Sequence, residues 1–570
     1  MANDFYARPR QEMLAILAGA FPEIPWQTLR FQLDPPRDPT HGDLSTNIAF
    51  VASRELRRAP REAALALHEV LGAHLGTSVS IAAAEVAGPG FLNITLRPGF
   101  KRAAEQEAIR DILRSGLNYG DLAGGSGQRV NVEYVSANPT GPMHVGHCRG
   151  AVVGDALAGL LAKAGYRVTK EYYINDAGAQ VEALAWAAYW RYLQAIGITI
   201  PSEEFSASAP GGLQYQGEYL VAVGVALAQR YADALAGPDP LQPSAETIAL
   251  VRAFAIAEMM QSIRADLARL GVVPDIFTSE RTLLESGAAD RAIGRLAEAG
   301  LLYEGKLPPP KGKLPEDWEP REQTLFRARA FGDETDRPLR KSDGSNTYFA
   351  NDIGYHADKL ARGAGLLIDV LGADHGGYVK RMQAAVAALS NRQASLEVVL
   401  CQIVHVLRAG KPVRMSKRAG SYITLRDLIE EVGRDAVRFT MLTRKADAQM
   451  EFDLDQAVAE TRENPVFYVQ YAHARCRSVL RAAAEMLGAS SVADEALSKV
   501  PLEAIGGPEE APLIRRLIAF PRLVEAAALA REPHRIAFFL YDLASDFHIL
   551  WNRGREDRAV RFLNADRPVE

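Results

Sequence analysis

The sequence is poor in cysteine and has no long apolar run. Its three cysteines, Cys148, Cys401 and Cys476, lie far apart and form no CxxC pair. This spacing argues against a structural zinc site and a disulfide framework, and is typical of a reducing cytoplasm. No stretch of about 18 uncharged apolar residues appears, so we expect no membrane-spanning helix. The start of the chain also lacks the basic segment and apolar run of a secretory signal.

An excess of charge of one sign is lacking too. The 65 Lys and Arg residues and the 70 Asp and Glu residues leave a net charge of −5. This balance does not exclude a nucleic-acid partner, because a large RNA requires local basic strips and not a basic average. Apolar residues make up 48% of the chain, as in ordinary soluble globular proteins. The length predicts about three to five domains.

Strand and helix signals indicate a multidomain α/β protein with an all-α end. Residues 1–120 mix helical patterns with short strands, which predicts a small α+β domain followed by a Gly-rich linker. Strand–helix alternation over 125–424 predicts a Rossmann-like parallel sheet. We expect two insertions in it, at about 195–250 and at about 305–345, the second of them irregular. Residues 425–570 show a helical pattern, typical of a bundle.

The most informative segment is the predicted loop between the first strand of the sheet and the helix after it. The loop runs from Glu133 and ends in His144-Val145-Gly146-His147. A helix start offers free N–H groups and a positive dipole end, and so favours anions. Gly146 lets a nucleotide approach the backbone, and the imidazoles can stabilise charge at a phosphate. The alternative is that both histidines are satisfied by their neighbours in the turn.

A second candidate segment lies about 270 residues further on. Arg414-Met415-Ser416-Lys417 forms a short cationic cluster between two glycines, Gly410 and Gly420. Such a loop can close on a triphosphate and neutralise the leaving pyrophosphate. Taken alone, a basic loop is more often a solvated surface, so its weight comes from occurring together with the first motif.

Together the two motifs resemble class I aminoacyl-tRNA synthetases. His144-Val145-Gly146-His147 is similar to their HIGH motif, and Arg414-Met415-Ser416-Lys417 is similar to their KMSK loop, with arginine at the first position. The resemblance implies catalytic roles for His144, His147, Arg414 and Lys417, and ATP binding by Gly146, Met415 and Ser416 together with Mg²⁺. The segment around Gly372, Asp374 and His375 looks like the third nucleotide segment of the class, although a plain strand-to-helix turn has the same pattern.

Further segments resemble arginyl-tRNA synthetases in particular. They include residues 41–47, 133–147, 215–219, 347–352 and 468–475. The resemblance implies that Glu133 and Asp352 face the substrate guanidinium, with Tyr348 packed beside them. Asn138 and His144 would hold the α-amino and carboxylate end of arginine. Guanidinium is a planar fork of donors that carboxylates accept bidentately, which fits this reading, although both acids could instead be surface charges or salt-bridge partners.

The same resemblance implies a set of contacts with tRNA-Arg. Tyr468, Tyr471 and Arg475 lie on one face of a predicted helix, and aromatic rings beside a guanidinium suit unstacked loop bases. Phe547 and Trp551 fall where the family has aromatic contacts, and Asn93 matches a residue that meets a base of the D-loop. Burial of the aromatic residues, and an asparagine bonded to its own strand, are the alternatives.

Three other readings remain open. A sibling class I synthetase for glutamine, glutamate or cysteine is the nearest, and isolated cysteines disfavour the last. A simple nucleotidyltransferase would require only about a third of this length. A non-catalytic RNA-binding descendant has no need of His144, His147, Lys417, Glu133 and Asp352 together. We expect a monomer, and the chain stops at Glu570, before the final helix and terminal methionine usual in the family.

Overall fold

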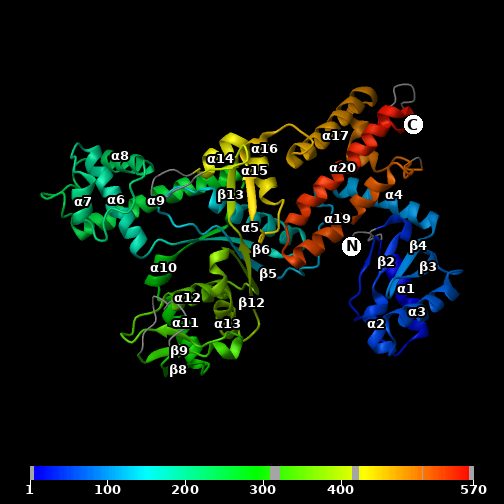
Figure 1. Cartoon of the computed structure of the whole chain (residues 1–570), viewed down its shortest axis with the longest axis horizontal. Helices are drawn as coiled ribbons and strands as arrows, with labels where there is room; N and C mark the ends of the chain where they lie inside the picture. The colour runs from blue at the N-terminus through cyan, green and yellow to red at the C-terminus, as the bar shows by residue number, and fades with distance from the viewer. Residues whose placement is uncertain (1–5, 37, 308–320, 414–422, 504, 564–570) are drawn as a thin grey trace. The chain divides into compact units, whose positions relative to one another are not determined.

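The computed structural model describes residues 6–36, 38–307, 321–413, 423–503 and 505–563. The chain forms two compact units, and Figure 1 shows its elements coloured along the sequence. Unit 1 comprises Met1–Gly120, Tyr471–Arg522 and Asp542–Glu570, and unit 2 comprises Asp121–Gln470 and Leu523–Tyr541. The N-terminal region therefore shares a unit with parts of the helical end of the chain.

The N-terminal part of unit 1 is a small α+β domain, as predicted. An antiparallel sheet has the order β1-β2-β4-β3, with β1 (Leu33–Asp34), β2 (Leu44–Thr46), β3 (Ile81–Ala87) and β4 (Phe91–Leu96). The helices of this part are α1 (Ala7–Ala20), α2 (Ile48–Leu56), α3 (Pro60–His74) and α4 (Pro98–Ser115). Its apolar core also takes in Ile514 and Ile518, which join the C-terminal helices to it within unit 1.

The C-terminal region is helical, as predicted. Its α-helices are α17 (Pro465–Leu487), α18 (Asp494–Leu497), α19 (Ala511–Ala530) and α20 (His534–Glu556). Within unit 1, Arg516 of α19 forms ion pairs with Asp542 and Asp546, two residues on one face of α20. These pairs tie α19 to α20.

A five-stranded sheet forms the centre of unit 2, and all its neighbouring strands are parallel, in the order β12-β11-β5-β6-β7. The strands are β5 (Arg129–Glu133), β6 (Arg167–Ile174), β7 (Ile276–Ser279), β11 (Leu366–Gly372) and β12 (Ser395–Cys401). Helix α5 (Val145–Lys163) crosses from β5 to β6 and packs closely, because a Cβ on Gly154 would come within 2.3 Å of the Tyr134 ring. The predicted Rossmann-like fold is confirmed.

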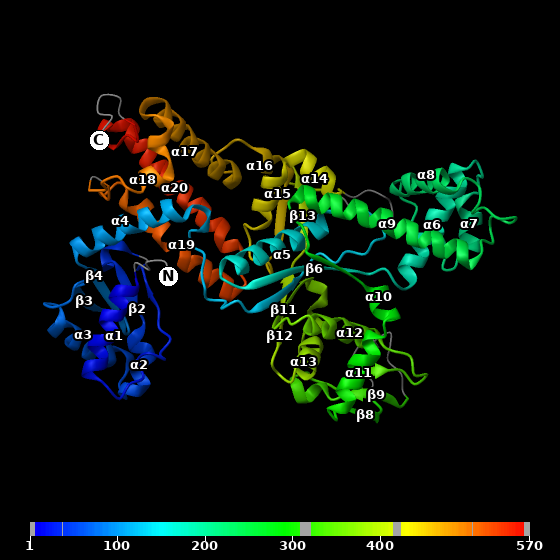
Figure 2. The same cartoon turned by 180° about the vertical axis from the view of Figure 1, so that it is seen from behind.

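Two insertions interrupt the sheet. The first is a helical group with its own apolar core, and Figure 2 shows its members: α6 (Ala179–Ala195), α7 (Ser202–Ser208), α8 (Tyr219–Tyr231) and α9 (Ala245–Leu270). The second follows α10 (Glu280–Glu285) and α11 (Ala288–Glu298). Its described part is not irregular, contrary to the prediction. It forms an antiparallel sheet of β8 (Leu302–Gly305), β9 (Gln323–Phe326) and β10 (Arg337–Arg340).

Phe326 and Leu339 of that second sheet explain the difference, because both are buried in a core shared with α11, α12 (Tyr348–Ala361) and α13 (Val379–Leu389). The three prolines at 308–310 suggested an irregular segment, but they lie outside the described residues. Packing against the helices, and not local pattern, makes these short strands.

The region that follows the parallel sheet belongs to unit 2 as far as Gln470. A small sheet has the order β14-β13-β15, with β13 (Val404–Arg408), β14 (Lys411–Pro412) and β15 (Met450–Asp453). The helices beside it are α14 (Leu425–Val432), α15 (Arg434–Met441) and α16 (Leu454–Val458). Arg149 of α5 is buried and donates to the carbonyls of Gln402, Lys445 and Ala448, which holds this region against α5.

Candidate active site

The predicted loop leaves β5 at the carboxyl edge of the parallel sheet and enters α5. His144 is the N-cap: its Nδ1 accepts from the backbone N–H of Gly146 at 3.1 Å, and the N–H of His144 points to Nδ1 of His147 at 3.3 Å. The two imidazole rings are stacked 4.0 Å apart. A Cβ on Gly146 would come within 2.8 Å of the His144 ring, so a larger residue here would push the ring out of place. Both histidines are thereby fixed at the positive end of α5.

The start of the same loop has an unusual backbone. Val135 and Ser136 have φ values of 72° and 40°, a region that residues with a Cβ rarely adopt. Ser136 is held there because its Oγ donates to Oε1 of Glu133 at 2.9 Å and accepts from the N–H of Tyr173 at 3.0 Å. Strained backbone of this kind persists where the surroundings impose it, and it is common at functional sites.

The third predicted segment lies at the same edge of the sheet. Strand β11 pairs with β5, with Asp369 opposite Glu133, so Gly372 at the end of β11 lies beyond the end of β5. Asp374 and His375 follow in the 3₁₀ helix η4 (Ala373–Tyr378), with side chains 85% and 56% exposed and 3.9 Å apart. Ligands of open parallel sheets bind at this edge.

The cationic segment, Arg414, Met415, Ser416 and Lys417, lies outside the described residues. The chain on its C-terminal side is described and contacts the first motif. The N–H of Val145 donates to the carbonyl of Ile423 at 3.3 Å, and His144 forms an antiparallel bridge with Thr424. The first motif is therefore paired through its backbone with the chain that follows the cationic segment, at Ile423 and Thr424.

Two predicted arginine-binding carboxylates lie near one another beside the sheet. Glu133 is buried at the end of β5, 7% exposed, and Asp352 lies on the second turn of α12. Burial, above all, raises the pKa of Asp352 to about 7; His356 lowers it, and Glu280, Glu133 and Asp369 raise it further. The hydroxyl of Tyr378 donates to Oδ2 of Asp352. Such a perturbed carboxyl is typical of functional sites.

Three other predicted site residues, unlike Glu133, are exposed or only half-buried. Tyr348 begins α12 with 70% of its surface exposed, so packing beside the carboxylates stays a prediction. Asn138 is exposed in the loop, and its Nδ2 donates to Oε1 of Gln180 at 2.8 Å. His144 is half-buried, next to the loop that carries Asn138.

The residues predicted to contact RNA differ in how far they are buried. Tyr468 is 9% exposed and its ring lies 5.2 Å from that of Tyr541, so it belongs to a core. Asn93 is buried in β4, also 9% exposed. Phe547 is 8% exposed and packs against the rings of Trp551 and Phe562. For these residues, contact with RNA stays a prediction.

An exposed aromatic–cation cluster remains on α17 and α20, within unit 1. The guanidinium of Arg475 lies 4.2 Å from the ring centre of Tyr471 and 4.9 Å from that of Trp551. It also donates to the hydroxyl of Tyr471 at 3.0 Å, and its Nη1 lies 3.1 Å from Nδ1 of His548. Tyr471 is 43% exposed. A flat exposed ring beside a cation is suited to stacking on a base.

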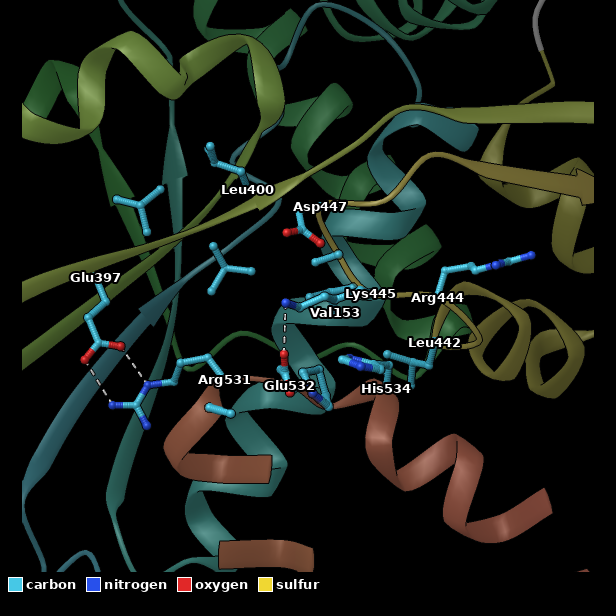
Figure 3. A pocket seen from close by; sticks show the side chains of 15 residues that line it. Val153, Glu397, Leu400, Leu442, Arg444, Lys445, Asp447, Arg531, Glu532 and His534 are labelled. Carbon is cyan, nitrogen blue, oxygen red and sulfur yellow. Dashed lines mark hydrogen bonds and ion pairs between the residues drawn. The ribbon is translucent and has the colours of Figure 1, made fainter. Parts of the chain in front are cut away.

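A cavity of about 260 Å³ in unit 2 contains none of the predicted site residues. Figure 3 shows Arg531 paired with Glu397 of β12 and Lys445 paired with Glu532 at this cavity. Among the described residues, no helix is long and apolar enough to cross a membrane. In the same part of the chain, no group of three His, Cys, Asp or Glu residues could hold a metal ion.

Sequence reasoning missed four side chains that hold the carboxylates: Ser136, Lys359, His356 and Tyr378. Nζ of Lys359 donates to Glu133, and Nε2 of His356 lies 2.9 Å from Oδ2 of Asp369. The available signal was a lysine and a histidine on the apolar face of α12, where unpaired polar residues are rare.

The comparisons with known proteins agree with the fold and the motifs. "Arginyl tRNA synthetase N terminal domain" matches residues 10–96, "tRNA synthetases class I (R), catalytic domain" residues 108–194, and "DALR anticodon binding domain" residues 469–570. The fold of Thermus thermophilus arginyl-tRNA synthetase matches with a TM-score of 0.67 at 22% identity, covering 95% of this chain and 91% of that one. The parallel sheet, the stacked histidines and the match to the catalytic-domain family together define a class I aminoacyl-tRNA synthetase.

Two curated relatives identify the family within this class. The chain is 60% identical over 564 residues to the arginine–tRNA ligase of Gluconobacter oxydans, covering 98% of this chain and 92% of that protein. It is 54% identical over 561 residues to that of a Methylobacterium species, covering 97% and 92%. The chain therefore belongs to the arginine–tRNA ligase family.

Proposed function

We propose that this protein is an active arginine–tRNA ligase. It activates arginine with ATP to arginyl-adenylate and pyrophosphate, and then transfers arginine to the 3′ end of tRNA-Arg. The observation that carries the proposal is the placement of two carboxylates, the buried Glu133 and the half-buried Asp352, beside the edge of the sheet where His144 and His147 begin α5. Family membership supports the same reaction.

The carboxylates supply the specificity. Glu133 and Asp352 accept the N–H groups of the guanidinium from different directions, with Tyr348 closing over it as arginine binds. An ammonium supplies a point charge and a ureido group none, so lysine and citrulline are rejected. Asn138 and His144 hold the α-amino and carboxylate end of the substrate.

The first reaction step needs no protein nucleophile, because the arginine carboxylate is already ionised and attacks the α-phosphate itself. His144, His147, Arg414 and Lys417 stabilise the charge that develops on the phosphates. Gly146, Gly372, Asp374, His375, Met415 and Ser416 bind the nucleotide. Mg²⁺ reaches the site on the ATP phosphates, in keeping with an ion that keeps several waters and few protein ligands.

The tRNA contacts belong to the exposed cluster of Tyr471, Arg475 and Trp551, with Phe547 supporting it. Tyr468 and Asn93 contribute only if RNA binding uncovers them, since both are 9% exposed. We further propose that the protein works in the cytoplasm as a monomer, the compartment being indicated by three separate free cysteines.

Amino-acid-dependent ATP–pyrophosphate exchange tests this function. Each amino acid is supplied in turn, with and without tRNA. Arginine alone should drive exchange, and Lys417→Ala should slow it while leaving arginine binding within about twofold. Exchange with glutamine or glutamate would indicate a sibling synthetase. No exchange under any condition, from folded protein that binds ATP, would indicate a non-catalytic RNA-binding protein.

A further inference from the structure

A single buried lysine joins the proposed arginine pocket to the parallel sheet. Lys359 lies on α12 and has no exposed surface. Its Nζ donates to Oε2 of Glu133 at 2.5 Å and to Oδ1 of Asp369 at 2.9 Å, and it lies 4.4 Å from the ring centre of Tyr355. The lysine therefore bridges two carboxylates that come from different strands.

The sheet itself creates the need for this bridge. Strands β5 and β11 are parallel neighbours, and their register sets Glu133 directly beside Asp369. Both carboxylates are buried, at 7% and 5% exposure, so their mutual repulsion is poorly screened. The cation between them opposes that repulsion. Burial lowers the pKa of Lys359, but Asp369, Glu133 and Glu171 together raise it above its ordinary value, which keeps the lysine charged.

The contacts leave Glu133 able to bind a substrate. Its Oε1 accepts one hydrogen bond from Ser136 and its Oε2 one from Lys359. The buried hydroxyl of Tyr355 also interacts with this carboxylate. A carboxylate offers about four acceptor positions, so these donors still leave one for a guanidinium N–H.

The charges around Lys359 also suit a cationic substrate. Glu133, Asp369 and Lys359 together carry a net charge of −1 when all are ionised, and Asp352 adds to it when it loses its proton. With Asp352 ionised, the four groups carry a net charge of −2, and a bound guanidinium reduces it to −1. Lys359 thus offsets one of the negative charges, and the guanidinium offsets another.

We propose that Lys359 is a positioning residue for arginine recognition, which fixes the Glu133 carboxylate in the orientation that accepts the guanidinium and balances the charge of Asp369. The inference rests on the proposed function, because it takes Glu133 to be a substrate ligand. Lys359 does not touch the substrate. It acts through Glu133.

The experiment compares Lys359→Met with Arg362→Met in arginine-dependent exchange. Arg362 follows the same helix and also pairs with a buried strand carboxylate, donating from Nη2 to both oxygens of Glu171, but it makes no contact with Glu133. Lys359→Met should raise KM for arginine at least about tenfold and change KM for ATP less than about twofold. Arg362→Met should lower the melting temperature without raising KM for arginine.

A double-variant cycle separates positioning from general stability. Glu133→Gln removes the charge that Lys359 holds, so adding Lys359→Met to it should have little further effect on KM for arginine. Lys359→Arg, which keeps the charge, should recover part of the lost affinity. If Lys359→Met alone fails to fold, the cycle is closed with Lys359→Gln, whose amide can still donate to Glu133.

Two results would overturn the inference. One is a KM for arginine in Lys359→Met that is unchanged or lower, with wild-type exchange intact. The other is an equal increase in Arg362→Met or in the Glu133→Gln background. Absence of arginine-dependent exchange in the wild-type protein would instead refute the proposed function, so the two failures are distinct.

Discussion

At the scale of single residues, the carboxyl group of Asp352 links substrate binding to pH. Its pKa of about 7 comes first from burial, and Glu280, Glu133 and Asp369 raise it while His356 lowers it. A guanidinium is accepted by the ionised carboxylate, so a protonated Asp352 must lose its proton before arginine binds. Affinity for arginine should therefore rise as the pH rises through about 7.

The first prediction concerns this linkage. Between pH 6 and pH 8, KM for arginine should fall about tenfold, because one proton must leave per arginine bound. Asp352→Asn should raise KM by about a hundredfold and abolish its pH dependence. Exchange kinetics across this range measure both effects, and KM for ATP serves as the control. The same pH slope in the variant would assign the titration to another group.

The second prediction is that the same variant is more stable than the wild type at high pH. A raised pKa means that folded Asp352 keeps a proton that the unfolded chain loses between its ordinary pKa of 3.8 and about 7. Its contribution to stability therefore falls as pH rises through that window. Asp352→Asn should melt higher than wild type by a few degrees at pH 8, with a smaller gain at pH 4. A lower melting temperature at pH 8 would contradict this.

At the scale of elements, the start of helix α5 fixes the catalytic histidines. Gly146→Ala brings a methyl group against the His144 ring, where a Cβ would lie 2.8 Å from Cε1, so it should slow exchange by at least about a hundredfold. Gly159→Ala, later in α5, meets nothing within 4 Å and is the matched control. It should keep full activity and gain about 0.5 to 1 kcal/mol of stability. Equal activity in the two variants would remove the role given to His144.

The fourth prediction concerns the aromatic–cation cluster on helices α17 and α20. Arg475→Ala removes the cation that lies over Tyr471 and Trp551, and should weaken tRNA binding about tenfold. Arg477→Ala removes one exposed charge from the opposite side of α17 and should have at most about a threefold effect. Filter binding at one fixed salt concentration measures both. An equal loss in the two variants would reduce the cluster to general electrostatic attraction.

Elements with local signals could be predicted from the sequence. The alternation that includes Val130 and Val132 gives β5, and the spacing of Leu157, Leu160 and Leu161 gives α5. Strands β9 and β10 could not be foreseen, because burial of Phe326 and Leu339 against distant helices makes them.

The candidate site divides in the same way. His144 and His147 lie in one continuous motif, so the sequence alone was enough to predict them as site residues. Lys359 meets Glu133 across 226 residues, and only the pairing of β5 with β11 and the packing of α12 bring them together. Periodicity also could not tell buried Tyr468 from exposed Tyr471, since both lie on α17 and differ only in what covers them.

At the scale of the whole molecule, the two proposed tasks fall in different units. Glu133, His144 and Asp352 lie in unit 2, whereas the exposed Tyr471 and the half-buried Arg475 lie in unit 1. Variants in the α17 cluster should therefore change KM for tRNA and leave KM for arginine within about twofold. The monomer is tested by light scattering, which should give 62.0 kDa; twice that mass would show a dimer.

The most direct test of the account is discrimination between arginine and citrulline, which differ in the charge that Glu133 is proposed to read. The ratio of kcat/KM for the two substrates is measured in pyrophosphate exchange for the wild type and for Glu133→Gln. The account predicts strong preference for arginine in the wild type, and a ratio at least about a hundredfold smaller in the variant. An unchanged ratio would mean that Glu133 does not read the guanidinium.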